Sequence, residues 1–204
     1  SDFGLMISLV MVGSTLSLIP AGMISDHTSR RGPIFVGTFI WVVVGYGLAS
    51  LAPGFWTLTI MLAVAGMGTS AWHPLATGTL TQTMPGQRAR VLGIHAMGGT
   101  LAEVFAPVLT GALLAFVDWR EGLALAVVPA LFVGIFFFVV RERLTVKVEN
   151  KASMLDLKEM WKSWSSRTGL ALVGMISIYN MAVTATLAMA TLYIVNDLGF
   201  SEFW

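Results

Sequence analysis

The chain has 204 residues, of which 56% are hydrophobic and only 11% are charged, and its formal net charge is +1. Soluble domains carry about 25% charged residues, so this composition excludes an ordinary water-facing surface and favours one that faces lipid. The sequence contains no cysteine, which excludes disulfides, thiolate metal sites and cysteine nucleophiles.

Six hydrophobic segments are long enough, or nearly so, to cross a bilayer, which takes roughly 20 mostly apolar residues. In chain order they are residues 3–24, 33–52, 55–81, 91–117, 123–140 and 169–195. These runs are continuous, whereas barrel strands alternate apolar and polar residues over about ten positions. We therefore expect an all-α fold, a polytopic membrane helical bundle with six transmembrane helices.

The break after the first segment carries the most distinctive motif of the chain. Gly22 is followed four positions later by Asp26, and Arg30 and Arg31 end the turn before the next hydrophobic run. A basic hairpin on the cytoplasmic side explains the two arginines, but it does not explain a glycine and an acid at these offsets. This motif is therefore a candidate functional site.

The pattern G-x-x-x-D-x-x-x-R-R resembles the loop between helices 2 and 3 of the major facilitator superfamily. That family usually has a basic residue directly after the acid and a glycine two positions later, where this chain has His27 and Ser29. The resemblance implies that Gly22, Asp26, Arg30 and Arg31 form a conformational latch between two halves of a transporter. An acid can cap the positive end of a facing helix, which suits that role. The alternative is that Asp26 only shapes the loop.

The basic residues divide unevenly between the two sides of the membrane. If successive loops lie on alternate sides of the membrane, the side with Arg30 and Arg31 holds 11 of the 12 Lys and Arg residues. The other side holds only Arg120. The positive-inside rule places the side with Arg30 and Arg31 in the cytoplasm. Loops 25–32, 83–90 and 141–168 are thus expected to be cytoplasmic, and the chain to be a multi-pass protein of a bacterial inner membrane.

The third segment contains a Gly-rich stretch with a His-Pro pair, residues 66–74. It resembles helix 4 of fosmidomycin-resistance-type efflux proteins, although the arginine that many relatives carry in this helix is absent. His73 precedes Pro74, which frees a backbone carbonyl inside the helix. We expect His73 either to satisfy this break or to line a substrate cavity.

Glu103 is the only acid deep inside a hydrophobic segment. A charge at that depth costs about 2.5 kcal/mol or more, so such an acid is usually functional or paired. His95 lies two turns earlier on roughly the same face, and we predict that Glu103 and His95 take part in proton coupling. The alternatives are a structural hydrogen bond for Glu103 and simple helix packing for His95. Residues 102–111 resemble the antiporter signature of helix 5, with Ala or Thr at three of its glycine positions.

The longest break, residues 141–168, is predicted to contain a short amphipathic helix. Ser153–Asp156 resembles a helix-start pattern, and Leu157, Met160, Trp161 and Trp164 follow at helical spacing. This helix lies either on the inner membrane surface or on protein as part of a linker.

In the last hydrophobic segment, Tyr179 and Asn180 interrupt the apolar run near its middle. They are candidates for lining a substrate cavity or for hydrogen bonding between helices.

The resemblance covers the whole chain and implies helices 2–7 of an expected twelve, with helix 1 and helices 8–12 missing. Residues 1–142 would belong to the N-terminal half, 143–168 to the linker between halves, and 169–204 to the start of the C-terminal half. The implied function is transport of a small organic solute by alternating access, with proton-coupled efflux expected first and proton-coupled uptake of a metabolite second. The chain by itself is not expected to transport.

Further expectations concern partners and cofactors. The lipid bilayer and a small organic substrate are the expected partners, with no nucleic acid, and the transporter is expected to be a monomer. We expect no cofactor, with a proton gradient as the energy source, and no metal, because the histidines lack ligand spacing. An enzyme is not expected, because acids, histidines and a nucleophile do not cluster at one depth.

Overall fold

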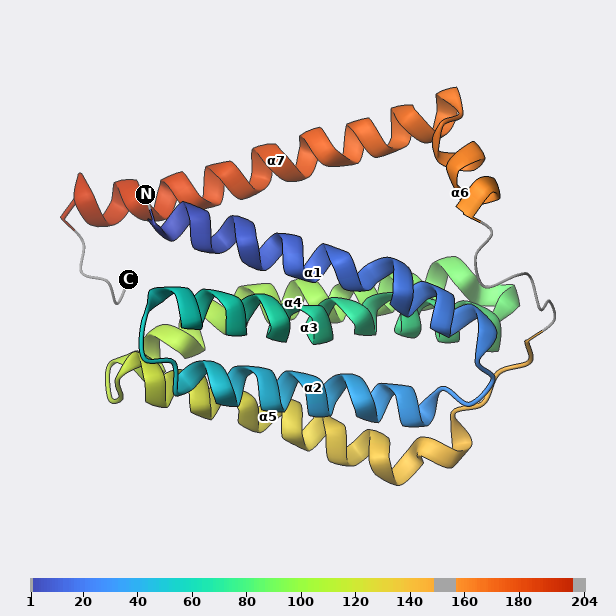
Figure 1. Cartoon of the computed structure of the whole chain (residues 1–204), viewed down its shortest axis with the longest axis horizontal. Helices are drawn as coiled ribbons and strands as arrows, with labels where there is room; N and C mark the ends of the chain where they lie inside the picture. Colours follow the sequence, from blue (N-terminus) through green and yellow to red (C-terminus); the bar gives the residue numbers. More distant parts are fainter. Residues whose placement is uncertain (1, 149–156, 200–204) are drawn as a thin grey trace. The chain divides into compact units, whose positions relative to one another are not determined.

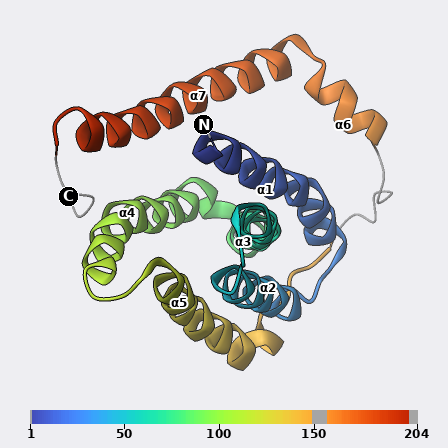
Figure 2. The same cartoon turned by 60° about the vertical axis from the view of Figure 1, so that its left-hand side comes forward.

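A computed structural model describes residues 2–148 and 157–199, and these form helices joined by short turns, with one isolated pair of extended residues. The chain divides into two compact units, Ser1–Lys151 and Ala152–Trp204. Figures 1 and 2 show the order of the helices.

The first unit contains five long helices and two short 3-10 turns. The helices are α1 (Asp2–His27), α2 (Gly32–Ser50), α3 (Phe55–Thr83), α4 (Arg88–Leu114) and α5 (Trp119–Val140), and the turns are η1 (Pro85–Gln87) and η2 (Arg141–Arg143). The second unit contains α6 (Leu157–Trp164) and α7 (Arg167–Asn196).

The prediction of an all-α bundle with six membrane spans is confirmed. Six helical stretches of the described chain are long and apolar enough to cross a membrane. They agree with the six expected segments to within about one helical turn at each end. The short helix α6 falls in the break where an amphipathic helix was predicted, whereas its predicted start signal, Ser153–Asp156, lies outside the described residues.

Local sequence signals explain where several helices begin. Asp118 accepts hydrogen bonds from the backbone N–H groups of Arg120 and Glu121, at 2.7 and 3.0 Å, in a capping box that starts α5. Ser166 accepts one from the N–H of Gly169 at 3.0 Å and caps α7. These side chains satisfy backbone donors that the first helical turn leaves without a partner.

Small residues allow α3 to pack closely on both α1 and α2. A Cβ atom added at Gly13 of α1 would lie 2.5 Å from the carbonyl oxygen of Ala63, and one added at Gly45 of α2 would lie 2.7 Å from the Cβ of Ala65. Close backbone approach through Gly and Ala is how membrane helices gain van der Waals contact. α2 also packs along α5, so α1, α3, α2 and α5 form a continuous set of neighbours.

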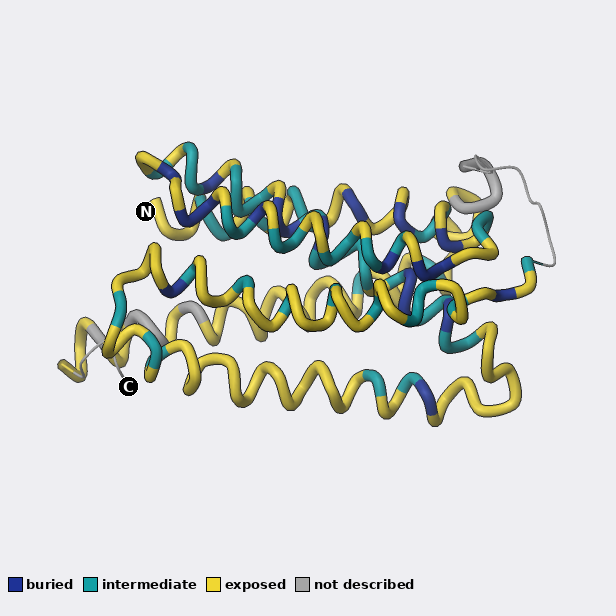
Figure 3. The backbone as a smooth tube through the Cα atoms, turned by 90° about the horizontal axis from the view of Figure 1, so that it is seen from below, coloured by how far each residue is buried: buried dark blue, intermediate teal, exposed yellow. Residues whose placement is uncertain are grey.

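The fourth helix packs much less closely within the first unit. Val91 is the one residue of α4 that is buried, and α4 has only sparse contacts with α3 and α5. Figure 3 shows the buried residues gathered on the other helices of the unit and on the turns at one end. That end carries the α1–α2 turn and η2, and we call it the charged end.

Candidate functional site

A buried arginine lies at the centre of the charged end. Arg31, in the turn between α1 and α2, is 0% exposed. Its guanidinium donates hydrogen bonds to the hydroxyl of Ser25 on α1 and, at 3.2 Å, to the side-chain oxygen of Gln82 near the end of α3. Its Nε has no hydrogen-bond partner among the described residues. This side chain therefore ties α1, α3 and the start of α2 together through neutral partners.

Burial lowers the pKa of the Arg31 guanidinium from its ordinary value, and the nearby Asp26 carboxylate acts in the opposite direction. The group stays protonated at physiological pH, because arginine does not lose its proton in proteins.

Gly78 provides the space for the hydrogen bond between Arg31 and Ser25. A Cβ atom at Gly78 would lie 2.8 Å from the hydroxyl oxygen of Ser25.

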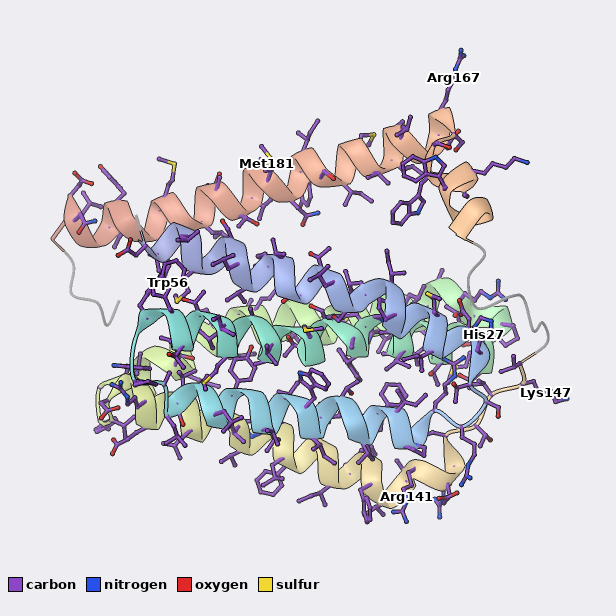
Figure 4. All side chains as sticks on the ribbon, viewed as in Figure 1. His27, Trp56, Arg141, Lys147, Arg167 and Met181 are labelled. Carbon is purple, nitrogen blue, oxygen red and sulfur yellow. The ribbon has the colours of Figure 1, made fainter. Side chains whose placement is uncertain are left out.

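Arg30, by contrast, points to an exposed partner. It forms an ion pair with Glu142 of η2, with 2.7 Å between the guanidinium nitrogen and the carboxylate oxygen. The two side chains are 66% and 62% exposed. An ion pair in this setting contributes about 0–1 kcal/mol, so it orients the turn more than it stabilises the fold. Figure 4 shows His27, Arg141 and Lys147 at the same end of the first unit.

Backbone hydrogen bonds join the α1–α2 turn to the chain that follows α5. We call residues 29–32 and 144–146 together the clasp, within which Arg30 and Thr145 form an isolated antiparallel bridge. Its hydrogen bonds run from the N–H of Arg31 to the oxygen of Leu144 (2.9 Å), from Gly32 to Leu144 (3.3 Å) and from Val146 to Ser29 (2.9 Å). The turn that holds the predicted latch is thus fixed by its own unit.

The four predicted latch residues lie in or beside this turn but in different surroundings. Gly22 on α1 faces Pro74 of α3, with 3.9 Å between an added Cβ and the Cβ of Pro74. Asp26 lies in the last turn of α1 and is exposed, so its carboxylate is accessible on the first unit. Asp26 therefore lies close enough to Arg31 to act on its charge, whereas Arg30 pairs with Glu142, and the role of Asp26 toward the other half of a transporter stays a prediction.

An aromatic cluster lies deeper in the first unit, between α2, α3 and α5. Phe137 stacks on Phe35 and Phe39, with ring centroids 4.8 and 5.3 Å apart. Trp72 meets the same two phenylalanines at 5.9 and 5.8 Å. These rings hold Trp72 in place, and Trp72 directly precedes His73.

The same cluster brings two histidines together. The rings of His73 on α3 and His95 on α4 lie 6.4 Å apart, and Trp72 lies 5.7 Å from His95. Glu103, the other predicted coupling residue, lies eight positions further along α4, which is about 12 Å along the axis. The ring contacts of His95 within the described residues are with Trp72 and His73 of α3, and coupling through His95 and Glu103 stays a prediction. A juxtaposition across two helices has no signal in the local sequence.

A cavity of about 500 Å³ opens beside His73. It lies between α2, α3 and α5, and no charged side chain lines it. Its lining residues are Thr38, Phe39, Val42, Gly68, Thr69, Trp72, His73, Ala130 and Val133. The cavity is therefore largely aromatic and aliphatic, and the polar groups of its lining side chains are two hydroxyls, one imidazole and one indole N–H.

The remaining predicted residues lie apart from this cluster. Glu103 is exposed on α4 and forms no ion pair with any described residue. In the second unit, Tyr179 and Asn180 are exposed on α7, and the amide of Asn180 donates to the carbonyl of Ile176 at 2.9 Å. Their predicted roles in coupling and in the cavity stay predictions. Over the described ranges, no group of three or more acids and histidines could hold a metal ion.

The second unit contains a short helix, α6, where the sequence predicts an amphipathic one, and its amphipathic role stays a prediction. Trp161 and Trp164 of α6 are 70% and 48% exposed, and Lys162 between them is exposed as well. The side chains of Leu157 and Met160 lie outside the described residues.

The whole chain matches the family model described as Major Facilitator Superfamily, over residues 1–204. A putative metabolite transport protein of Haemophilus influenzae is 23% identical over 97% of this chain and 51% of its own length. The D-xylose transporter of Levilactobacillus brevis is 30% identical, covering 71% of this chain and 32% of that protein. The puromycin resistance protein pur8 of Streptomyces alboniger is 34% identical over 50% of this chain and 21% of that protein. The chain thus spans about half the length of the first of these relatives and about a third of the second.

Proposed function

The chain belongs to the major facilitator superfamily, and from this premise we propose that it forms six membrane helices of a transporter that moves a small organic solute by alternating access. It is an integral, multi-pass membrane protein and not an enzyme. In such transporters the two halves rock about a site near the middle of the membrane. The lipid bilayer and the solute are its partners.

The preferred function is efflux of the solute in exchange for protons. Three similarities support this choice. Residues 102–111 of α4 resemble the antiporter signature, and residues 66–74 of α3 resemble fosmidomycin-resistance-type proteins. The chain is also similar to a puromycin resistance protein. Uptake of a metabolite together with protons is the second candidate. The similarity to a D-xylose transporter and to a hexuronate transporter of Bacillus subtilis favours it.

The observation that carries proton coupling is the contact between His73 and His95 next to the uncharged cavity. Imidazole is the side chain that gains and loses a proton near neutral pH. The two imidazole rings lie 6.4 Å apart, centroid to centroid, and His73 also lines the cavity. A proton bound by either ring would lie close to the solute, which would link proton and solute occupancy. Glu103 is the other coupling candidate.

The turn around Arg31 supports the proposed latch. An acid that binds another part of the protein must itself be held in place. Arg31 and the clasp hold the end of α1 and the turn that follows it on the first unit. Asp26 then presents an exposed acid that could cap a helix of the other half. We place this end in the cytoplasm of a bacterial cell, because the loops that alternate to this side of the membrane carry 11 of the 12 Lys and Arg residues. We also propose that the transporter acts as a monomer.

Flux measurements test the proposal in a transporter that contains this chain. Everted membrane vesicles would be loaded with puromycin, D-xylose or glucuronate, and a pH gradient would be imposed with and without a protonophore. Efflux coupling predicts that puromycin moves against the proton flow and that the protonophore abolishes this movement. Movement of a sugar with the protons instead would establish the uptake alternative. If the pH gradient changes the flux of none of the three solutes, proton coupling is contradicted.

A further inference from the structure

A second cavity of the first unit lies at the turn between α3 and α4, and a charged side chain lines it. Its volume is about 500 Å³, and its walls come from the end of α3, from η1 and from the first turns of α4. Arg90 is the charged residue of this lining, and we call the space the basic cavity. The cavity beside His73 has no charged side chain in its lining, so the two cavities favour different ligands.

One face of α4 is turned toward the basic cavity. Arg90 and Ile94 line it and are four positions apart, as are Val91 and His95, and residues with this spacing lie one above the other on a helix. The turn η1 separates α4 from α3 at this end, and the two helices have only sparse contacts. The space between them is therefore left to a cavity and is not filled by interlocking side chains.

The polar side chains of the basic cavity are hydrogen-bond donors, and none of them is an acid. Arg90 is exposed and forms no ion pair with any described residue. Its guanidinium presents a planar fork of N–H groups that fits a carboxylate. The amide of Gln87 and the imidazole of His95 each carry at least one further N–H. The positive end of the α4 dipole lies at the same turn, so the chemistry of this lining favours an anion.

The rest of the lining is apolar. Leu80 and Met84 at the end of α3 and Val91 and Ile94 of α4 supply hydrocarbon and thioether surface. A simple inorganic anion would leave most of this surface uncovered. Pockets for small organic ligands have volumes of about 300–1,000 Å³, and the basic cavity falls within this range. The ligand that fits both parts of the lining is an anion with an apolar body.

We propose that the basic cavity binds an organic carboxylate, with its charged group on Arg90 and its apolar body against Leu80 and Ile94. His95 lines this cavity, and its ring lies 6.4 Å from that of His73, which lines the uncharged cavity. The histidine pair thus connects the two cavities. Binding itself does not require transport, whereas use of the basic cavity as an arrival site for the transported solute rests on the proposed function.

Direct binding to the 204-residue chain tests the site. The chain would be placed in phosphatidylcholine nanodiscs at about 0.15 M salt, where the field of distant charges is screened. Binding of 2-naphthoate would be measured by equilibrium dialysis, with empty nanodiscs as the reference. Arg90→Gln is expected to raise the dissociation constant about tenfold, because a charged hydrogen-bond partner is lost. The uncharged 2-naphthamide is expected to bind equally weakly to the parent chain and to Arg90→Gln.

Matched variants separate the cavity from the basic surface around it. Arg88→Gln removes a charge two positions away that does not line the cavity, and is expected to change the dissociation constant by less than about twofold. Ile94→Trp is expected to fill the cavity and abolish naphthoate binding while Arg90 is retained. Met97→Trp, at a similarly exposed position of α4 outside the lining, is expected to bind naphthoate as the parent does.

Three results would overturn the proposal. Equal naphthoate binding by the parent, Arg90→Gln and Ile94→Trp would mean that the cavity is not the site. Equal weakening by Arg90→Gln and Arg88→Gln would mean that only the general basic surface attracts the anion. If phosphatidylglycerol in the nanodisc displaces naphthoate from the parent but leaves the residual binding of Arg90→Gln unchanged, the occupant is a lipid headgroup.

The binding assay also distinguishes this site from the proposed function. Specific naphthoate binding together with an absence of solute flux in a transporter that contains the chain would reject transport and leave the site intact. Solute flux that persists without naphthoate binding would reject the site and leave the transporter intact.

Discussion

The buried guanidinium of Arg31 donates a hydrogen bond to the side-chain oxygen of Gln82, 3.2 Å away at the end of α3. A buried cation usually has an acid as its partner, because taking a charge out of water is costly. Here the direct partners, Gln82 and Ser25, are neutral, and Asp26 contributes only through its field. The charged end therefore depends on hydrogen bonds, and removing one of them should be measurable.

Gln82→Ala is expected to destabilise the chain by about 1–2 kcal/mol, because hydrogen bonds to charged groups are stronger than neutral ones. Unfolding of the purified chain in detergent would measure this. Thr83→Ala, at the next position, is exposed and is the control, since its hydroxyl bonds only the backbone of its own helix. Equal stability of both variants would show that the Arg31–Gln82 bond contributes nothing.

Gly78→Ala is expected to destabilise the same end by overpacking. The new methyl group would lie 2.8 Å from the hydroxyl oxygen of Ser25, and insertions of this kind cost about 1–3 kcal/mol. Gly93 of α4 has no such neighbour within 4 Å. Gly93→Ala should therefore be neutral or stabilising by up to about 1 kcal/mol, because Ala favours a helix over Gly. Thermal unfolding of the two variants measures the difference, and equal stability of Gly78→Ala and Gly93→Ala would contradict the prediction.

Asp26→Asn is expected to leave membrane insertion intact and to slow transport roughly tenfold, as an altered balance between the two open states would do. The measurement is solute flux at matched protein levels in a transporter containing the chain. Asp197→Asn, at the end of α7, is the control for loss of an exposed acid. Normal flux in Asp26→Asn would mean that the acid only shapes its loop.

Glu103→Gln is expected to abolish accumulation driven by a pH difference alone while exchange of solute at equal concentrations continues. The reason is that Gln cannot bind and release a proton, whereas it keeps the size of Glu. Vesicle flux with and without an imposed gradient separates the two activities. A variant that still accumulates solute against its gradient would exclude Glu103 as the coupling acid.

His95→Gln is expected to reduce the solute flux that a pH gradient drives, because an amide cannot bind and release a proton as an imidazole can. His73→Gln should have the same effect if the two rings act together, and the double variant should then be no worse than either single one. Phe39→Leu, in the wall of the cavity, is the control for a change of shape without loss of a titratable group. Unaltered gradient-driven flux in both single variants would reject the histidine pair.

The sequence by itself was enough to predict the membrane helices, because the length and apolar character of a segment decide whether it can span a bilayer. The caps of helices are equally local, as the Asp118–Glu121 capping box illustrates. Gly22, Asp26, Arg30 and Arg31 were likewise recognisable, since their spacing along one turn is itself the signal.

Only the tertiary structure decided which distant residues meet. Arg30 and Glu142 are 112 positions apart in the chain, and the clasp around them depends on how α2 and α5 pack. The contact of His73 with His95 depends in the same way on the register of α3 against α4. Side-chain packing sets such registers, and a hydrophobic pattern that is apolar on every face leaves them undetermined.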